Sequence, residues 1–135
     1  MHLMFLMFLQ ETLRAQIKIS QRRPEYGEAV SLLVGLMDDA SNLTLNAEAL
    51  IRRSNYSYSH MNRLFLKETG TTLNSYLTTK KLEYAKSLLI HTSMPLCDVG
   101  AAIGFDNPAH FSVFFKKHTG ECPSKFVKQF NDRHN

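Results

Sequence analysis

An internal repeat constrains the fold of this chain more than any other feature of its sequence. When the 135 residues are compared with themselves at an offset of 50 positions, one pattern occurs twice. The identical pairs are His60 and His110, Phe65 and Phe115, Lys67 and Lys117, Thr69 and Thr119, and Gly70 and Gly120. Upstream, the copies continue at an offset of 49, which pairs Tyr56 with Phe105 and Asn55 with Gly104. Self-similarity at a fixed period indicates that one supersecondary unit is used twice.

The first copy predicts a short helix, a tight turn and a second helix. The short helix covers residues 47–54, and Asn55 ends it because asparagine tolerates the left-handed backbone conformation. Ser57 has the side chain of an N-cap, so a second helix starts after it and runs to about Glu68. Gly70 then stops this helix.

The second copy predicts the same arrangement. A short helix over 96–103 is followed by Gly104 at the turn, and Asn107 with Pro108 begins a helix that ends before Gly120. Between the copies, a long helix over residues 73–91 is expected to act as a rigid spacer. Its apolar face comprises Leu73, Tyr76, Leu77, Ala85, Leu88 and Leu89.

Two more amphipathic helices precede the repeat, one over residues 3–19 and one from about Pro24 to Met37. No run with the period of a β-strand follows, so we predict an all-α protein. The predicted organisation is an N-terminal amphipathic helix in 1–20 and an all-α domain in 24–130 that contains both copies of the repeat. Within that domain the first helix-turn-helix unit covers about 46–70, the linker helix about 73–91 and the second unit about 95–120.

Positive charge is concentrated in the first unit and the linker helix. The chain has 16 Lys and Arg against 12 Asp and Glu, a formal net charge of +4. Seven of those basic residues fall between Arg52 and Lys86, a segment with only Glu68 and Glu83 as acids. A local basic block of this kind is expected of a surface that binds a polyanion, and a solvated helix surface rich in Lys and Arg is the alternative explanation.

Several classes of protein are disfavoured. Cys97 and Cys122 form no CxxC motif, so we interpret them as reduced thiols of a cytoplasmic protein. His118 and Cys122 have the spacing of two metal ligands, but two ligands do not make a site. We find no motif of an enzyme, cofactor or metal site, and therefore predict a protein that is not an enzyme and has no cofactor. The apolar segment Met1 to Leu9 is too short to span a membrane.

The two copies resemble the DNA-binding domain of the AraC/XylS transcriptional regulators. The resemblance is carried by Tyr58 to Gly70 and, more specifically, by the pattern GF…F…FK…G…P between Gly104 and Pro123. It covers roughly Pro24 to Phe130 and implies a seven-helix double helix-turn-helix domain over 24–130. The resemblance implies two recognition helices, the second helix of each unit, that enter successive major-groove segments on one side of double-stranded DNA.

The resemblance also implies which residues read bases. On the first recognition helix these are Ser59, Asn62 and Arg63, which share one stripe of the helix. Arg63 can contact guanine with two hydrogen bonds, and Asn62 can pair with adenine. The matching residues of the second recognition helix are Ala109, Ser112 and Val113.

The two units are therefore expected to play unequal roles. Ala109, Ser112 and Val113 offer only a hydroxyl and apolar contact to a thymine methyl group. We hypothesise that the first unit specifies the sequence and that the second mostly positions the protein on phosphates. The predicted phosphate contacts are Lys67, Lys116 and Lys117. Gly100, where the family usually has another small residue, is expected to cost its helix up to about 1 kcal/mol.

The predicted function is sequence-specific binding of double-stranded DNA by a bacterial transcription regulator. The alternative is a helical protein-interaction module that binds a partner regulator or RNA polymerase without reading DNA. RNA polymerase is also a candidate partner of a DNA-bound regulator, and the N-terminal helix is a candidate homodimer contact. The chain is expected to be either part of a longer, metabolite-responsive regulator or a stand-alone monomeric activator.

Overall fold

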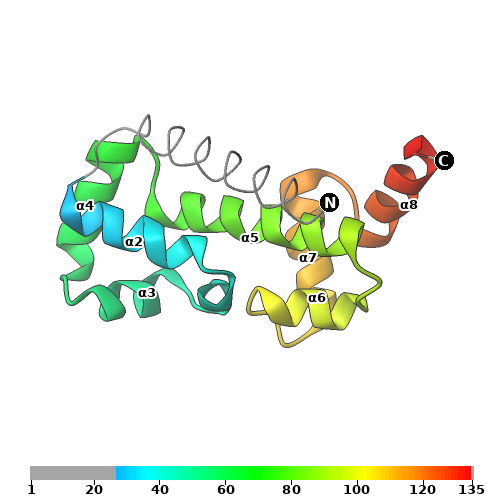
Figure 1. The fold of residues 1–135 in the computed structure, drawn as a ribbon, viewed down its shortest axis with the longest axis horizontal. Helices are drawn as coiled ribbons and strands as arrows, with labels where there is room; N and C mark the ends of the chain where they lie inside the picture. The colour runs from blue at the N-terminus through cyan, green and yellow to red at the C-terminus, as the bar shows by residue number, and fades with distance from the viewer. Residues whose placement is uncertain (1–26, 135) are drawn as a thin grey trace, which may run out of the picture.

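The computed structural model describes residues 27–134, and within this range the chain is entirely helical (Figure 1). The all-α prediction is confirmed for these residues. The predicted helix over 3–19 lies outside them. The elements in chain order are α2 (Glu28–Asp38), the 3₁₀ helix η1 (Ala40–Thr44), α3 (Ala47–Ser54), α4 (Tyr58–Thr69), α5 (Leu73–His91), α6 (Leu96–Ala102), α7 (Pro108–Thr119) and α8 (Pro123–His134).

Local capping signals set most of the helix boundaries where they were expected. Asn55 has a φ of 62° and closes α3 in the left-handed conformation. The Ser57 side chain accepts a hydrogen bond from the His60 N–H at 3.3 Å, which caps α4. The Asn107 side chain accepts one from the Ala109 N–H at 2.8 Å, and Pro108 occupies the first turn of α7. These predictions are confirmed because each depends only on neighbouring residues.

Two boundaries differ from the sequence prediction. The predicted helix from about Pro24 begins instead at Glu28, because Gly27 is its non-helical N-cap and its N–H donates to the distant Glu68 Oε2 at 3.1 Å. The helix predicted over 96–103 ends one residue earlier, since the Ile103 N–H turns back to the Gly100 carbonyl.

The 3₁₀ helix η1 is an additional element that was not predicted. Asp39 begins it by accepting hydrogen bonds from the Ser41 N–H at 3.0 Å and the Ser41 hydroxyl at 2.8 Å. Asn42, only 6% exposed, donates from its amide to the Leu36 carbonyl at 2.9 Å. These bonds join η1 firmly to the end of α2.

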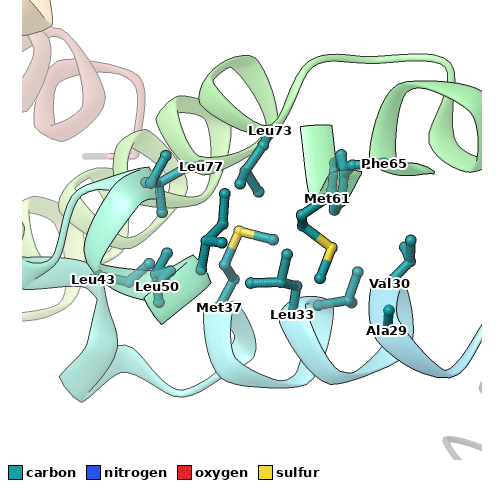
Figure 2. Close-up of a cluster of buried hydrophobic side chains, with 13 residues drawn as sticks. Ala29, Val30, Leu33, Met37, Leu43, Leu50, Met61, Phe65, Leu73 and Leu77 are labelled. Atoms are coloured by element: carbon teal, nitrogen blue, oxygen red, sulfur yellow. The ribbon is translucent and has the colours of Figure 1, made fainter. Parts of the chain in front are cut away.

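The first core lies between α2, α3, α4 and the first half of α5 (Figure 2). Figure 2 shows apolar side chains from these helices converging on Met37 and Met61, which are almost completely buried. Leu73 and Leu77 extend the cluster onto α5. Burying a side chain of this size stabilises the fold by roughly 1.5–3 kcal/mol, so this cluster holds the first unit together.

The second core lies between the end of α5, α6, α7 and α8. Its buried members are Ala85, Leu89, Val99, Ile103, Phe111 and Phe115. Tyr84, on the middle of α5, packs against both cores. The linker helix therefore carries part of each core, and Figure 1 shows the two units side by side along its length.

The repeat in the sequence is a repeat in packing. Phe65 meets Tyr76 edge-on with ring centroids 5.3 Å apart, and Phe115 meets Phe126 in the same way at 5.5 Å. Thr69 donates to the Phe65 carbonyl at 2.7 Å, and its counterpart Thr119 donates to the Phe115 carbonyl at 2.8 Å. Thus α8 packs against α7 in the second unit in the same way as the start of α5 packs against α4 in the first.

Candidate nucleic-acid interface

The two recognition helices, α4 and α7, run in the same direction across the molecule. In Figure 1 each starts beside the short helix of its unit, α3 or α6, and ends at the opposite edge. They are separated along α5 and belong to different cores. This arrangement leaves one face of each recognition helix open to a ligand.

On α4 the predicted base-reading residues lie away from the core. Met61 and Phe65 are fully buried on the opposite side of the helix. Ser59 and Arg63 are exposed, and Asn62 is half-buried. A helix with a buried apolar face presents its remaining stripe to solvent, so these three side chains share an accessible surface.

The corresponding stripe of α7 has the same exposure pattern but a different chemistry. Ala109 is exposed, Ser112 is half-buried, and Phe111 and Phe115 are fully buried behind them. Val113 is 68% exposed and has no polar atom in its side chain. The α7 stripe therefore combines an accessible surface with almost no capacity for hydrogen bonds.

Basic side chains lie on both recognition helices near their C-terminal ends. Lys67 on α4 is exposed, and so are Lys116 and Lys117 on α7. The N-termini of both helices lie at the other end, where the positive end of the helix dipole favours an anion. Each helix can thus meet phosphates at two places along its length.

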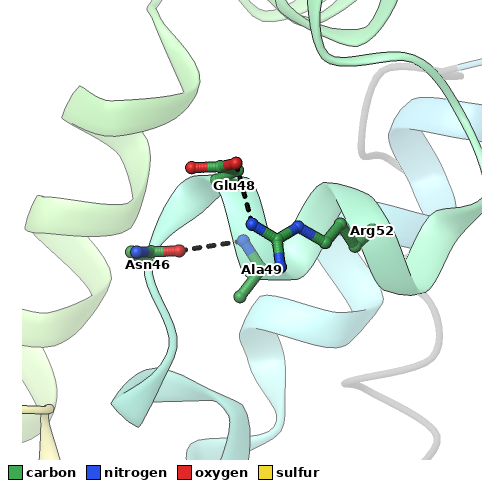
Figure 3. A network of polar contacts seen from close by, with 4 residues as sticks. All are labelled: Asn46, Glu48, Ala49 and Arg52. Carbon is green, nitrogen blue, oxygen red and sulfur yellow. Dashed lines mark hydrogen bonds and ion pairs between the residues drawn. The ribbon is translucent and has the colours of Figure 1, made fainter.

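The rest of the basic block is partly used inside the protein. Figure 3 shows Arg52 turned back along α3, where its Nη2 contacts Glu48 Oε1 at 2.8 Å. In the same view the Asn46 side chain caps α3 by accepting from the Ala49 N–H at 2.8 Å. Arg53 Nη1 donates to the side-chain oxygen of the buried Asn42 at 2.8 Å. Two of the seven cations therefore serve α3 and η1.

Two lysines of the linker helix α5 are also partly buried within the protein. Lys80 Nζ lies 3.0 Å from Asp38 Oδ1, which joins α5 to the end of α2. Partial burial lowers the pKa of Lys80, but the hydrogen bond and charge of Asp38 outweigh it, so the pKa is raised. Burial lowers the pKa of Lys81. Of the seven cations in the basic block, Arg63 and Lys67 on α4 are exposed and lie outside these contacts.

Sequence reasoning missed one accessible apolar residue of α4. Leu66 is 50% exposed and follows Asn62 and Arg63 on the same stripe at helical spacing. The repeat contained the signal, because Leu66 corresponds to Lys116 of α7. A position that carries a charge in one copy and a leucine in the other is a surface position.

The histidines and cysteines of residues 27–134 are not gathered into a metal site. His60 and His110 are both exposed at equivalent positions of the recognition helices. His118 packs its ring against Phe114 at 4.8 Å, and Gly120 ends α7 before Cys122. Over the same residues, no three His, Cys, Asp or Glu side chains come together as a metal site would require.

The comparisons with known proteins agree with this geometry. The model of a family described as a helix-turn-helix domain matches residues 50–129, more than half of the chain. The HTH-type transcriptional activator RhaR of Cronobacter sakazakii is 26% identical over 132 residues. The chain belongs to the AraC/XylS family. Its described helices form an AraC-type DNA-binding domain, and sequence-specific binding of DNA by a transcription regulator is the function of that domain.

Other members of the AraC/XylS family resemble the repeat region. The arabinose operon regulatory protein of Escherichia coli is 40% identical over 70 residues, which cover 52% of this chain and 24% of that protein. The match to RhaR covers 90% of this chain and 47% of RhaR, so the chain spans about half the length of that relative. The DNA-binding domain of AdpA, solved in complex with a target DNA, has the same fold with a TM-score of 0.66 and 22% identity, and the match covers 75% of this chain and 95% of that one. In the part of the chain that is described, no helix has both the length and the apolar composition to cross a membrane.

Proposed function

We propose that this AraC/XylS domain places α4 and α7 in successive major-groove segments on one side of a DNA duplex, with unequal roles for the two helices. The observation that carries the proposal is the contrast between two equally accessible stripes. The α4 stripe contains Arg63 and Asn62, whereas the α7 stripe presents Val113 at the position equivalent to Arg63.

In this proposal α4 supplies the direct readout of sequence. Arg63 donates two hydrogen bonds to guanine O6 and N7, and Asn62 pairs with adenine N6 and N7. Ser59 adds a hydroxyl near the N-terminal end of the helix. Exposed Leu66 contributes apolar contact at the far end of the stripe. Each bidentate pair discriminates against the wrong base by about 1–3 kcal/mol.

The proposed role of α7 is mainly to hold the protein in register on the duplex. Ala109 and Val113 provide apolar contacts to thymine methyl groups, and Ser112 provides a hydroxyl. Lys116 and Lys117 contact phosphates, which position a protein without selecting a sequence, and the positive end of the α7 dipole favours a phosphate near its N-terminus. Lys67 does the same on α4.

A comparison of Arg63→Ala with Val113→Ala tests the division of roles. A binding site is first enriched from a pool of random duplexes, and affinities are then measured by gel shift against that site and a scrambled duplex. Loss of Arg63 should weaken specific binding by about 1–3 kcal/mol, roughly 5- to 150-fold, and relax the preference at one base pair. Loss of Val113 should have a smaller effect. A larger loss from the valine substitution would overturn the proposal.

The lysines are tested by the salt dependence of the affinity. Neutralised phosphates release counterions, so binding should weaken steeply as salt is raised. Lys116→Ala and Lys117→Ala should each weaken binding to all sequences alike and reduce the slope of log affinity against log salt by about 1. An affinity that is insensitive to salt would contradict the phosphate contacts.

The proposed role requires no catalytic chemistry, and it places the protein in the bacterial cytoplasm, where the chromosome is accessible. RNA polymerase and a second copy of the chain remain proposed partners. The predicted homodimer contact belongs to the N-terminal residues outside the described range. Sedimentation of the chain separates a monomeric activator from a self-associating regulator. A protein-interaction module would bind specific and scrambled duplexes equally poorly at both low and high salt.

A further inference from the structure

The turn of the second unit rests directly on the 3₁₀ helix of the first. Gly104 lies between α6 and α7 with a φ of 98°, and a β-carbon at this position would stand 2.7 Å from the Thr44 carbonyl oxygen. The same atom would be 3.3 Å from the Thr44 carbonyl carbon. Only a residue without a side chain allows the two backbones to approach this closely.

The surface that receives Gly104 is a rigid part of the first unit. Asn42, in the middle of η1, donates to the Leu36 carbonyl of α2 and accepts from Arg53 of α3. Its own carbonyl accepts the Leu45 N–H at 3.1 Å. The η1 backbone is therefore held by two helices of the first core, and it cannot retreat from Gly104 without breaking these bonds.

We propose that the contact between Gly104 and the Thr44 carbonyl determines the spacing of the two recognition helices. The units are also joined through α5, on which Tyr84 packs against both cores, and α6 lies against η1 beside the Gly104 contact. A single helix leaves bending and twisting about its axis as the soft motions between the units. A second contact away from that axis removes them, and Gly104 precedes α7 by only a few residues.

The consequence for DNA concerns the distance between the two half-sites, and this part rests on the proposed function. A base pair inserted between the half-sites moves and rotates one major-groove segment relative to the other. A protein whose recognition helices have a fixed spacing binds such an altered site more weakly. A protein whose units move independently tolerates it.

Gly104→Ala is the test variant, and Gly120→Ala is its matched control. Gly120 ends α7 with a φ of 84°, so alanine there has comparable backbone strain. A β-carbon at Gly120, however, meets no atom of the described residues within 4 Å. The difference between the two variants therefore reports the contact with Thr44 and not the strained φ.

The first measurement needs no DNA. Arg63→Cys and Val113→Cys place spin labels at equivalent, exposed positions of α4 and α7, in a full chain that also carries Cys97→Ser and Cys122→Ser. Pulsed electron resonance then gives the distribution of distances between the labels. We expect Gly104→Ala to shift or broaden this distribution and Gly120→Ala to leave it unchanged. Equal distributions in the two variants would overturn the proposal, whether or not the chain binds DNA.

The second measurement uses the enriched site and versions with one base pair inserted or removed between its halves, in chains without labels. We expect the preference for the native spacing to fall by about threefold or more in Gly104→Ala and to persist in Gly120→Ala. An unchanged preference in Gly104→Ala overturns the spacing role. If the unmodified chain binds no duplex specifically, the proposed function fails, and the label distances alone decide the contact.

Asn42→Ala provides an independent variant if circular dichroism shows that Gly104→Ala does not fold. It acts from the other side of the contact, because it removes the side chain that anchors η1 to α2 and α3. The distance distribution should again broaden. A distribution as narrow as that of the unmodified chain would overturn the proposal.

Discussion

Replacing Gly100 by alanine tests how closely α6 and α7 must pack. A β-carbon built at Gly100 lies 3.0 Å from Phe111 Cβ and 3.1 Å from Phe111 Cγ. Both atoms lie at the base of a fully buried side chain, so the ring cannot rotate away from the added methyl group. Either α6 or α7 must shift, and the second core resists such a shift because it is densely packed.

The magnitude follows from two opposing terms. Alanine is favoured over glycine in a helix interior by about 1 kcal/mol. This is the loss of helix stability that the sequence predicts for Gly100. Overpacking a buried position costs about 1–3 kcal/mol. The expected net effect of Gly100→Ala is a loss of up to about 2 kcal/mol in the free energy of unfolding.

Gly35 provides the matched control for the helical term. It is an exposed glycine within α2, where an added β-carbon meets no atom of the described residues within 4 Å. Gly35→Ala should therefore raise the free energy of unfolding by about 0.5–1 kcal/mol. Urea unfolding followed by circular dichroism measures both variants. If Gly100→Ala stabilised the protein as much as Gly35→Ala does, the steric explanation would be refuted.

Three further substitutions test other parts of the fold by the same unfolding measurement. Ser57→Ala removes the cap of α4 and should cost about 1 kcal/mol; a change below about 0.3 kcal/mol would show that the cap is dispensable. Phe115→Ala should cost about 3–5 kcal/mol because it empties the second core, and a loss under about 1 kcal/mol would contradict that packing. Lys80→Met removes the pair with Asp38 and should cost about 0.5 kcal/mol at neutral pH. Folding raises the pKa of Lys80, so the stability that its charge provides is complete below its ordinary pKa of 10.5. This stability is lost as the pH rises through the higher pKa of the folded state. If Lys80→Met were still less stable than the unmodified chain above that pH, the ion pair would be contradicted.

The accuracy of the sequence predictions followed the range of the interactions involved. Ser57, Asn55 and Asn107 act on residues within three positions of themselves, and the helices that they cap lie where the pattern indicated. The predicted start of α2 was wrong because the observed start depends on a contact with Glu68, which is 41 positions away from Gly27. The element η1 was missed because an isolated five-residue helix has no periodicity to detect.

The candidate DNA interface divides in the same way. The resemblance to the family singled out Ser59, Asn62 and Arg63, and helical spacing predicted that these three residues share one face. Their base-reading roles stay predictions. The basic block was overestimated from the sequence, since Arg53 and Lys80 are engaged by Asn42 and Asp38 of other elements.

By itself, the sequence determined the repeat, the helices, their caps and the two exposed stripes, because each of these depends on residues that are close together along the chain. Only the tertiary structure decided which cations serve the fold, why α6 requires Gly100 beside Phe111, and how Gly104 meets Thr44. These features depend on the distance between backbones that are remote in sequence. That distance is set by the packing of both cores on α5 and not by any local preference.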